Sequence, residues 1–417
     1  MILDSPISII PNYIHPGLGR SVSYLLNKVI RTELDATMLK VLPLPNLPFM
    51  PSSVDMDEAK PPSTLTYWVY SSPKNLALRS NSKQKTRIMA TLNVTPDSFS
   101  DGSEHDTLCT ALSYVEESVV AGADIIDIGG YSTRPGAVFV SVNEETERIS
   151  PVVRAIRANE ATRMIPISVD SFRWEVAEAA ILAGVNVIND VYAFTGSKSL
   201  PGSWQQDEKA LSIMGKMKQL GRKYATPVVL MHSRGDAGQG KCYSSYRYAE
   251  KNGTTAVVEG VRTELGDKVE RIVKGKGGLR RWLIIVDPGI GFSKTVADNL
   301  ELLRNGSKVV ENTEIGQGKY DVVYTCVYAS RIHSNAGNTR RRNPLAGFPT
   351  LIGTSRKSFI GSILLEAGKG RETLPRERAW ATASAVACAV QQGVMVARVH
   401  DVKEMRDVLT MADALWS

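Results

Sequence analysis

Polar residues that could bind and react with a small molecule recur at one kind of place in this sequence, directly after short apolar runs. The first run, 88–92, ends in Asn93 and opens into a segment of small and polar residues that includes Asp101. Such a run is typical of a buried parallel strand, and apolar residues at helical spacing follow it. Strand, polar loop and helix form the repeating unit of α/β barrels, whose chemistry lies on such loops. We therefore expect a site built from strand ends.

This unit recurs along the chain. Apolar runs interpreted as strands lie at 88–92, 125–128, 165–169, 185–188, 226–230, 283–286, 350–352 and 393–399. Strands that alternate with helices favour a parallel sheet, and eight of them favour closure into a (β/α)8 TIM barrel. A doubly wound open sheet is the alternative. The stretches 233–281 and 305–347 interrupt the rhythm and are interpreted as long loop insertions, the second of them exposed and poorly ordered.

The first 85 residues do not follow this unit and are predicted to be mostly irregular. Residues 1–32 have an extended, proline-punctuated start, and Ser21 could cap a short helix. Residues 33–85 are rich in proline, serine and lysine without a sustained period, which indicates a linker with a strand at 65–70. The barrel is expected to span 86–417.

Composition and charge exclude several classes of protein. The hydrophobic content is 43% and the charged content 22%, as in ordinary globular proteins, and no apolar run is long enough to cross a bilayer. The net charge of +7 lies partly in the expected insertions without interleaved aromatic residues, so no nucleic-acid partner is predicted. The four cysteines have no CxxC spacing and are expected to be buried free thiols. The expected compartment is the cytoplasm, with the mitochondrion as the alternative.

The strand ends bring together side chains of two chemical kinds. The full set is Asn93, Asp101, Thr133, Arg134, Asp170, Asn189, Met231, Asp287, Phe292, Lys357, Arg398 and His400. Asp170, Asn189 and Asp287 suit a flat heterocycle with an amino-pyrimidinone edge, because a carboxylate accepts two parallel N–H bonds and an amide both donates and accepts. Met231 and Phe292 could form the apolar faces around that ring. Singly, an Asp after a strand is most often a helix cap, so the hypothesis depends on the set.

The remaining side chains are donors suited to an anion. Arg398, His400 and Asn93, with Lys357, could bind a phosphate or diphosphate. The loop at 132–136 could close over the site as a lid. The sequence contains no Walker A loop, GxGxxG or HExxH motif and no clustered His and Cys. Any metal is therefore expected to be a hard cation held together with the phosphates.

Taken in order, these segments resemble one family. The blocks TLNVTPDSFSDGS, DIIDIGGYSTRPGA, ISVDSF, VINDV, VVLMHSRGD, VDPGIGFSK, LIGTSRKS and ARVHDV resemble dihydropteroate synthase over about 86–417, apart from the two insertions. The segment IIPNYIHPGLGRSVSYLL resembles the C-terminal end of hydroxymethyldihydropterin pyrophosphokinase, which precedes the synthase in fungal folate-synthesis proteins. Nothing resembles the catalytic portions of that kinase, so we predict no kinase activity from this chain and interpret 1–32 as a remnant of a larger multifunctional protein.

The resemblance implies a reaction. The expected activity is transfer of a dihydropterinylmethyl group from its diphosphate ester to 4-aminobenzoate, with Mg²⁺ as cofactor and a homodimer as the assembly. The pterin would be held by Asp170, Asn189, Met231, Asp287, Phe292 and Lys357, and the diphosphate and Mg²⁺ by Asn93, Arg398 and His400. The aminobenzoate, at the pocket that sulfonamides occupy, would be framed by Thr133, Arg134, Pro135, Phe292, Lys357 and Ser358. Asp101, Arg134 and Lys357 are the candidate catalytic residues. Tyr131 departs from the Glu of many bacterial relatives.

Two other functions are compatible with a pterin-binding barrel. The folate-binding domain of corrinoid methyltransferases would share the pterin-binding Asp and Asn positions but has no use for the GGYSTRPGA loop or the TSRKS and RVH segments. A non-catalytic remnant is the other alternative, suggested by the short kinase-like segment. Against it, every matched position keeps its charged or polar residue.

Overall fold

The computed structural model describes most of the region expected to form the barrel and short pieces of the N-terminal region. The described residues are 14–15, 19–21, 24, 40–45, 65–70, 85–95, 104–132, 138–197, 203–235, 238, 240–243, 254–316, 340–366 and 370–416. Of the predicted site, Asp101, Thr133, Arg134 and Pro135 lie outside them.

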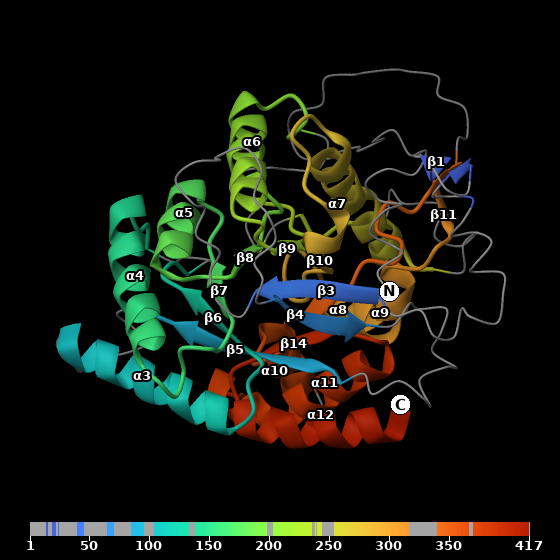
Figure 1. Cartoon of the computed structure of the whole chain (residues 1–417). Coiled ribbons are helices and arrows are strands. Elements are labelled where there is room, and N and C mark those ends of the chain that lie inside the picture. Colours follow the sequence, from blue (N-terminus) through green and yellow to red (C-terminus); the bar gives the residue numbers. More distant parts are fainter. Residues whose placement is uncertain are drawn as a thin grey trace.

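Eight parallel strands form a closed barrel (Figure 1). They are β5 (Arg87–Asn93), β6 (Ile125–Gly129), β7 (Ile167–Asp170), β8 (Val187–Asp190), β9 (Val228–Met231), β10 (Ile284–Asp287), β13 (Leu351–Ile352) and β14 (Val396–Val399). Their order is β10-β9-β8-β7-β6-β5-β14-β13. A parallel bridge between Val286 and Thr350 then joins β10 to the β13 end. This closure confirms the predicted (β/α)8 TIM barrel and excludes the open doubly wound sheet, and each predicted run overlaps one of these strands.

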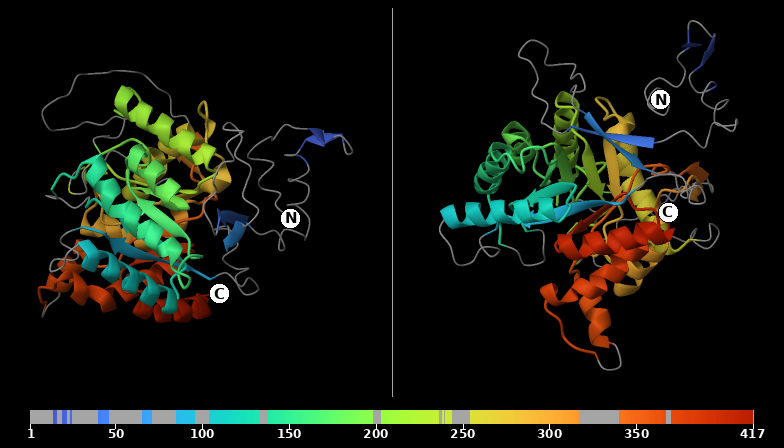
Figure 2. Two further views of the ribbon diagram at one scale, coloured as in Figure 1. Left: turned by 60° about the vertical axis from the view of Figure 1, so that its left-hand side comes forward. Right: turned by 60° about the horizontal axis from the view of Figure 1, so that its bottom comes forward.

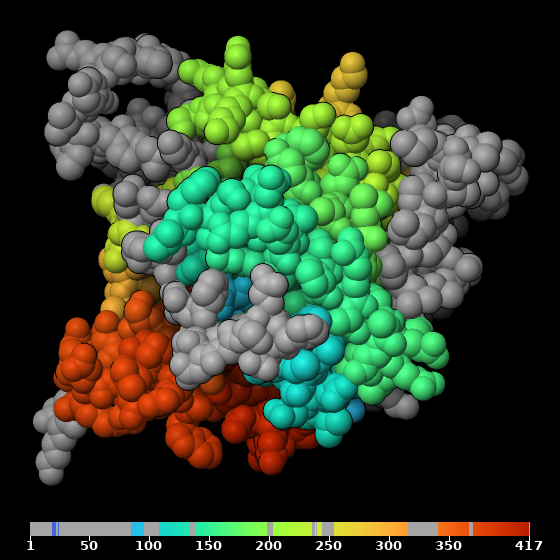
Figure 3. Space-filling view, turned by 90° about the vertical axis from the view of Figure 1, so that its left-hand side faces the viewer, coloured from blue at the N-terminus to red at the C-terminus, as the bar shows by residue number. Residues whose placement is uncertain are grey.

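Helices follow the strands and cover the outside of the barrel (Figures 1 and 2). They are α3 (Glu104–Val120), α4 (Val142–Ala158), α5 (Trp174–Ala183), α6 (Glu208–Lys223), α7 (Ala256–Lys274), α8 (Val296–Arg304), α9 (Gly306–Val309), α10 (Ser358–Glu366), α11 (Ala379–Gln391) and α12 (Val402–Trp416). In Figure 3 the surfaces of α3 to α6 run from cyan to yellow-green, beside the orange surface of α10 and α11. The predicted inward residues of the last helix, Met405 and Leu409, are buried.

The barrel interior changes from apolar to polar along the strands. One buried cluster contains Met89, Ile125, Val187, Val229, Ile285, Leu351, Met395 and Val396. Because strand side chains alternate between the two faces, the residue two positions later on a strand faces the same interior. Those later positions include Thr91, Asp127, Asn189, Met231, Asp287 and Arg398. The strands therefore place polar side chains together at their C-terminal ends, next to the apolar cluster in the barrel interior.

A hairpin lies at the other end of the barrel. The predicted strand at 65–70 is confirmed as β4 (Leu65–Tyr70), which pairs antiparallel with β3 (Lys40–Pro45) over six residue pairs. The β3 strand lies next to η5 (Arg281–Leu283), just before β10 begins. Further upstream, β1 (Ile14–His15) pairs with β2 (Arg20–Ser21), and Ser21 Oγ accepts a hydrogen bond from Tyr24 N at 3.1 Å, as a helix cap would. Regular structure therefore extends into the predicted linker.

The two expected insertions are not loops throughout. The stretch 233–281 contains α7, a 19-residue helix in which most residues are buried against the barrel. Within 305–347, α9 and the antiparallel pair β11 (Glu314–Gly316) and β12 (Arg340–Arg342) are ordered elements, and Ile315 and Leu345 are fully buried. The expectation of exposure is therefore wrong for these parts, while 317–339 lies outside the described residues.

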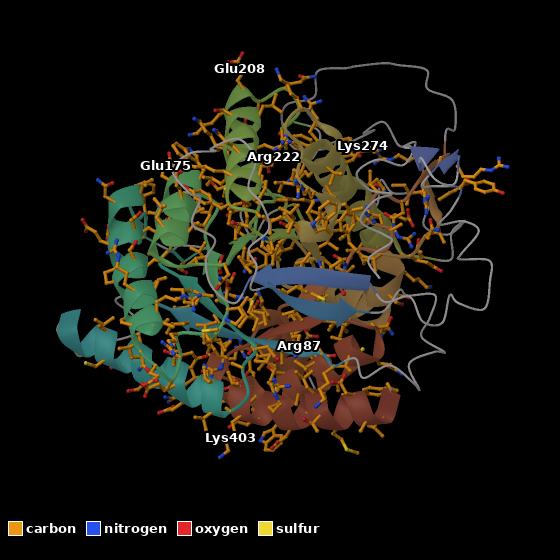
Figure 4. The ribbon with its side chains drawn as sticks, in the orientation of Figure 1. Arg87, Glu175, Glu208, Arg222, Lys274 and Lys403 are labelled. Atoms are coloured by element: carbon orange, nitrogen blue, oxygen red, sulfur yellow. The ribbon has the colours of Figure 1, made fainter. Side chains whose placement is uncertain are left out.

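The outer side of the helical layer carries charged side chains. Figure 4 shows Glu175, Glu208, Arg222, Lys274 and Lys403 on this surface, and all five side chains are exposed. None of the helices in the described part of the chain combines the length and apolar character that a membrane span requires. The cysteine prediction is wrong in one respect, because two of the three described free thiols are exposed and the third is half-buried.

Candidate active site

The centre of the site is an ion-pair bridge across the C-terminal end of the barrel. Arg398, on β14, donates from Nε to Asp127 Oδ2 at 2.6 Å and from Nη2 to Asp170 Oδ2 at 2.8 Å. Asn189 Nδ2 donates to the same Asp127 oxygen at 3.1 Å. Burial alone would lower the pKa of Arg398, but the adjacent carboxylates of Asp127 and Asp170 raise it. The guanidinium therefore keeps its charge and connects β6, β7 and β14.

Asp170 is a half-buried carboxyl group with opposing influences on its charge. Burial raises the pKa of Asp170 to about 7, Arg398 opposes this rise, and the nearby Asp127 adds to it. A Cβ at Gly129 would lie 3.8 Å from Asp170 Oδ2 and 3.7 Å from Asn93 Oδ1. The missing side chain at Gly129 thus leaves a small cradle between two oxygen atoms at the ends of β5 and β7, the strands on either side of β6.

Asp287 occupies the opposite side of the barrel end. Its Oδ1 accepts a hydrogen bond from Gly289 N at 2.7 Å. Burial raises the pKa of Asp287 to about 6, and the positive charges of Lys357 and Lys294 oppose that rise. Gly289 has a φ of +72°, and a Cβ there would lie 2.0 Å from the carbonyl oxygen of His232. Only glycine fits this turn, which points the backbone N–H at the carboxylate.

An apolar wall stands between the two carboxyl groups. Met231 belongs to a buried cluster against which Phe172 and Phe292 pack, so the two residues predicted to contact the faces of a ring lie close together. Lys357 Nζ lies 4.3 Å from the centroid of the Phe292 ring, a cation–π distance. The wall is therefore apolar with a cation at its edge, an arrangement suited to the face of a polar heteroaromatic ring.

The predicted anion-binding residues lie at the ends of three adjacent strands, β5, β14 and β13. His400 Nδ1 lies 3.0 Å from Ser355 Oγ, and His400 N donates to the same oxygen at 3.2 Å. Ser355 belongs to the segment that carries Lys357, so the TSRKS and RVH segments are joined directly. Ser358 is exposed at the start of α10.

Asp127 was not predicted as a site residue. It is fully buried, and its Oδ1 has no hydrogen-bond partner among the described residues. The available signal was a carboxylate inside the apolar run 125–128, two residues after the inward-facing Ile125. Such a charge is costly to bury without a partner, so the run itself indicated a buried cation nearby.

A second buried charge network lies behind the apolar wall. His232 Nε2 is 3.0 Å from Glu264 Oε2, and His232 Nδ1 is 3.0 Å from Lys294 Nζ. Arg234 pairs with the same carboxylate through Nε and Nη2. Lys294 Nζ also donates to the carbonyl oxygen of Phe292 at 2.9 Å. The network therefore links α7, which carries Glu264, to the loop that carries Phe292.

Burial determines the protonation states of the groups in this network. Burial, with a further contribution from Lys294, lowers the pKa of His232 to about 3. Burial also lowers the pKa of Lys294 to about 7. Burial would raise the pKa of Glu264, but hydrogen bonds from His232 and Arg234 hold it below its usual range. With Lys294 donating to Nδ1, the neutral His232 carries its proton on Nε2 and donates to Glu264.

The buried His232 predicts a pH dependence of stability. Unfolded histidine takes up a proton near pH 6.5, whereas folded His232 does so near pH 3, so the unfolded state binds more protons between these values. Its contribution to the free energy of unfolding should therefore fall by about 1.4 kcal/mol from pH 7.5 to 5.5. Urea unfolding of the wild type and of His232→Gln at both pH values measures the difference. Parallel pH profiles for the two proteins would contradict the prediction.

The residues fit a transient magnesium ion better than a permanent one. No group of three or more His, Cys, Asp or Glu side chains that could hold a metal occurs in the described ranges. Mg²⁺ commonly uses one or two protein oxygens together with substrate phosphates and water. The half-buried Asn93 amide oxygen beside the Gly129 cradle suits that mode of binding.

Comparison with known proteins agrees with this geometry. Residues 89–400 match the family described as pterin binding enzyme. The chain is 35% identical over 334 residues to dihydropteroate synthase of Bacillus subtilis, covering 80% of this chain and 90% of the relative. It is 30% identical over 417 residues to the folic acid synthesis protein fol1 of Pneumocystis carinii, covering all of this chain but only 44% of that protein. A solved dihydropteroate synthase of Xanthomonas albilineans with 4-aminobenzoic acid is 32% identical with a TM-score of 0.57, covering 80% of this chain and 94% of that one.

The barrel and the site therefore define a pterin-binding enzyme. Within that class, the identity to full-length bacterial synthases places the chain in the dihydropteroate synthase family, a family of transferases of folate biosynthesis. The predicted family and fold are thus confirmed.

Proposed function

We propose that this chain condenses (7,8-dihydropterin-6-yl)methyl diphosphate with 4-aminobenzoate, giving 7,8-dihydropteroate and diphosphate. The observation that carries the residue assignment is the bridge from Asp127 through Arg398 to Asp170, which faces Asp287 across one end of the barrel. Buried carboxylates and an amide at that place suit the amino-pyrimidinone edge of a pterin.

The pterin would lie against the apolar wall. Asp170, Asn189 and Asp287 would accept and donate hydrogen bonds along its polar edge, while Met231 and Phe292 contact its faces. Gly289 already occupies one oxygen of Asp287, so the other oxygen remains for the substrate. Lys357, next to the Phe292 ring, would contact both the pterin and the aminobenzoate.

The leaving group would be bound by the donors at the ends of β5 and β14. Arg398 uses Nε and Nη2 on carboxylates, which leaves Nη1 for the diphosphate. Asn93 and His400 would complete this subsite. Asn93 would also hold Mg²⁺, which would neutralise negative charge on the diphosphate.

The bond changes require little acid–base chemistry. The C–O bond at the pterin methylene breaks and its electron pair leaves with diphosphate. The electron-rich dihydropterin carries the resulting cation, and the charges of Asp170 and Asp287 stabilise it. The aromatic amine then forms the C–N bond and loses a proton to solvent or diphosphate. An SN1-like path of this kind explains why the proposed site has no dedicated general base. Thr133, Arg134, Pro135 and Ser358 stay predictions for the aminobenzoate side, and Asp101 stays a predicted catalytic residue.

A homodimer is proposed as the working assembly. The surface formed by α10, α11 and the turn η6 (Pro375–Arg378) between them exposes large apolar side chains, with Trp380 84% exposed and Leu365 and Leu374 56% exposed each. Exposed apolar residues concentrated on one face are typical of a protein interface.

Lys357→Ala tests the proposed function. We expect kcat/KM for dihydropteroate formation to fall by roughly 100- to 1,000-fold, because the variant loses a cation aimed at charge in the site. The assay uses purified protein, Mg²⁺, dihydropterin diphosphate and labelled 4-aminobenzoate, with a sulfonamide as competitor.

Lys403→Ala is the matched control, because Lys403 is an exposed lysine on α12 (Figure 4). Its activity should equal that of the wild type. A folded wild-type protein that binds the pterin tightly but forms no product would instead support a non-catalytic remnant.

A further inference from the structure

Arg378 lies outside the site but forms hydrogen bonds to the backbone of Lys357 and of the residue before it. It is the last residue of η6, on the outer side of the barrel. Its Nη1 donates to the carbonyl oxygens of Arg356 at 3.1 Å and Lys357 at 3.4 Å. Its Nη2 and Nε donate to Thr373 O at 2.7 Å and Thr373 Oγ1 at 3.1 Å. All three guanidinium nitrogens therefore donate hydrogen bonds to oxygens of Arg356, Lys357 and Thr373, and these bonds restrain the backbone of the three residues.

The backbone that Arg378 holds has an uncommon conformation. Arg356 has a φ of +60°, in the left-handed region that is unfavourable for a residue with a side chain. Three contacts maintain it. Thr382 Oγ1 accepts from Arg356 N at 3.2 Å, the Arg356 side chain pairs with Asp401, and Arg378 binds the carbonyl side. The surroundings thus impose a turn that the residue would not adopt alone.

This turn directs Lys357 into the site. While its carbonyl group faces Arg378, its side chain crosses Gly291, where a Cβ would lie 2.9 Å from Lys357 Cδ. The ammonium group then reaches the Phe292 ring. If the contacts of Arg378 with this turn were lost, the Lys357 side chain would no longer be held in place against the Phe292 ring.

Helix α10 leaves space for this guanidinium. A Cβ at Gly361 would lie 2.7 Å from both Cζ and Nη2 of Arg378. Contacts shorter than 3 Å between these atoms cannot be accommodated, so an alanine at Gly361 would displace the arginine. The glycine therefore offers an independent way to disturb the same contact.

We propose that Arg378 is a positioning residue that acts on the reaction through Lys357, and that Gly361 provides its space. The inference rests on the proposed role of Lys357. Arg378→Met should weaken binding of dihydropterin diphosphate and lower kcat/KM by about 10- to 100-fold, since it removes the hydrogen bonds that fix the turn. Arg378→Lys, which keeps a donor, should restore part of the loss, and Gly361→Ala should act in the same direction as Arg378→Met.

A double-mutant cycle separates positioning from general stability. In the Lys357→Ala background, Arg378→Met should change the Kd for dihydropterin diphosphate by less than about twofold, because residues that act through one another are not additive. Titration of the ligand into each variant measures the Kd even where turnover is lost. Equal losses in both backgrounds would overturn the proposal, as would wild-type Kd and kcat/KM in Arg378→Met.

Arg157→Met is the matched control. Arg157 also binds backbone carbonyls, those of Gly184 at 2.9 Å and Ile165 at 2.6 Å, but at the entry to β7 and β8, away from the site. It should lower thermal stability and leave the Kd unchanged in both backgrounds. If Arg378→Met does not fold, Gly361→Ala and Arg378→Lys take its place in the cycle. Wild-type activity of Lys357→Ala would refute the proposed function of Lys357 instead.

Discussion

Arg398→Met is expected to lower the free energy of unfolding by about 3–5 kcal/mol, because removing one member of a buried ion pair leaves the other charge uncompensated. Asp127 is fully buried and would keep only the hydrogen bond from Asn189. Without the cation between them, Asp127 and Asp170 would also repel each other. Activity should fall by about 1,000-fold or more, since the variant loses a donor for the leaving group and the support of Asp170. Urea unfolding and steady-state kinetics measure the two effects.

Two further variants test the reason for this loss. Asp127→Asn in the Arg398→Met background removes one unpaired carboxylate, so part of the stability should return while activity does not. Arg406→Met is the matched control, because Arg406 pairs at 2.8 Å with Asp124 Oδ2, whose side chain is 17% exposed, whereas Asp127 is fully buried. A pair of that kind contributes at most about 1 kcal/mol. Equal costs for Arg398→Met and Arg406→Met would contradict a buried bridge.

The barrel was predictable because its strands are short apolar runs that end in polar residues. The same pattern located Asp170, Asn189, Asp287 and Arg398, since parallel strands bring their C-terminal ends to one edge. The sequence pattern alone could not show that Arg398 donates two hydrogen bonds to carboxylates. One of these bonds goes to Asp127, which was overlooked because apolar residues precede and follow it in the sequence.

Helix α7 was missed although part of its signal was present in the sequence. Val257, Val261, Leu265, Val269 and Ile272 recur at helical spacing and are buried, which is the apolar period of a helix packed on a core. The same helix also buries Glu264 and Lys268, whose partners are distant in sequence: His232 for Glu264 and the carbonyl oxygen of Tyr192 for Lys268. Periodicity could therefore indicate the helix, but it could not show that these charged side chains are buried as well.

Glu264→Leu tests whether that buried face is held by charge. The change leaves Arg234 without its carboxylate and His232 without its acceptor, so we expect the free energy of unfolding to fall by about 3–5 kcal/mol. The pterin Kd should rise as well, because Lys294 and the Phe292 carbonyl belong to the same network. Urea unfolding and pterin titration measure these changes.

The matched control lies on the same helix. Glu270 pairs with Lys274 at 2.6 Å and Arg341 at 3.1 Å, but its side chain is 34% exposed, so Glu270→Leu should cost at most about 1 kcal/mol. If Glu264→Leu costs no more, the network does not stabilise the barrel. Adding Arg234→Met to Glu264→Leu removes the cation that has lost its carboxylate and should recover part of the stability, because a buried charge without its counter-ion is more destabilising than the absence of the whole ion pair. Recovery of stability without recovery of pterin affinity would separate the two functions of the network. One is to stabilise the barrel, and the other is to hold Phe292 beside the substrate.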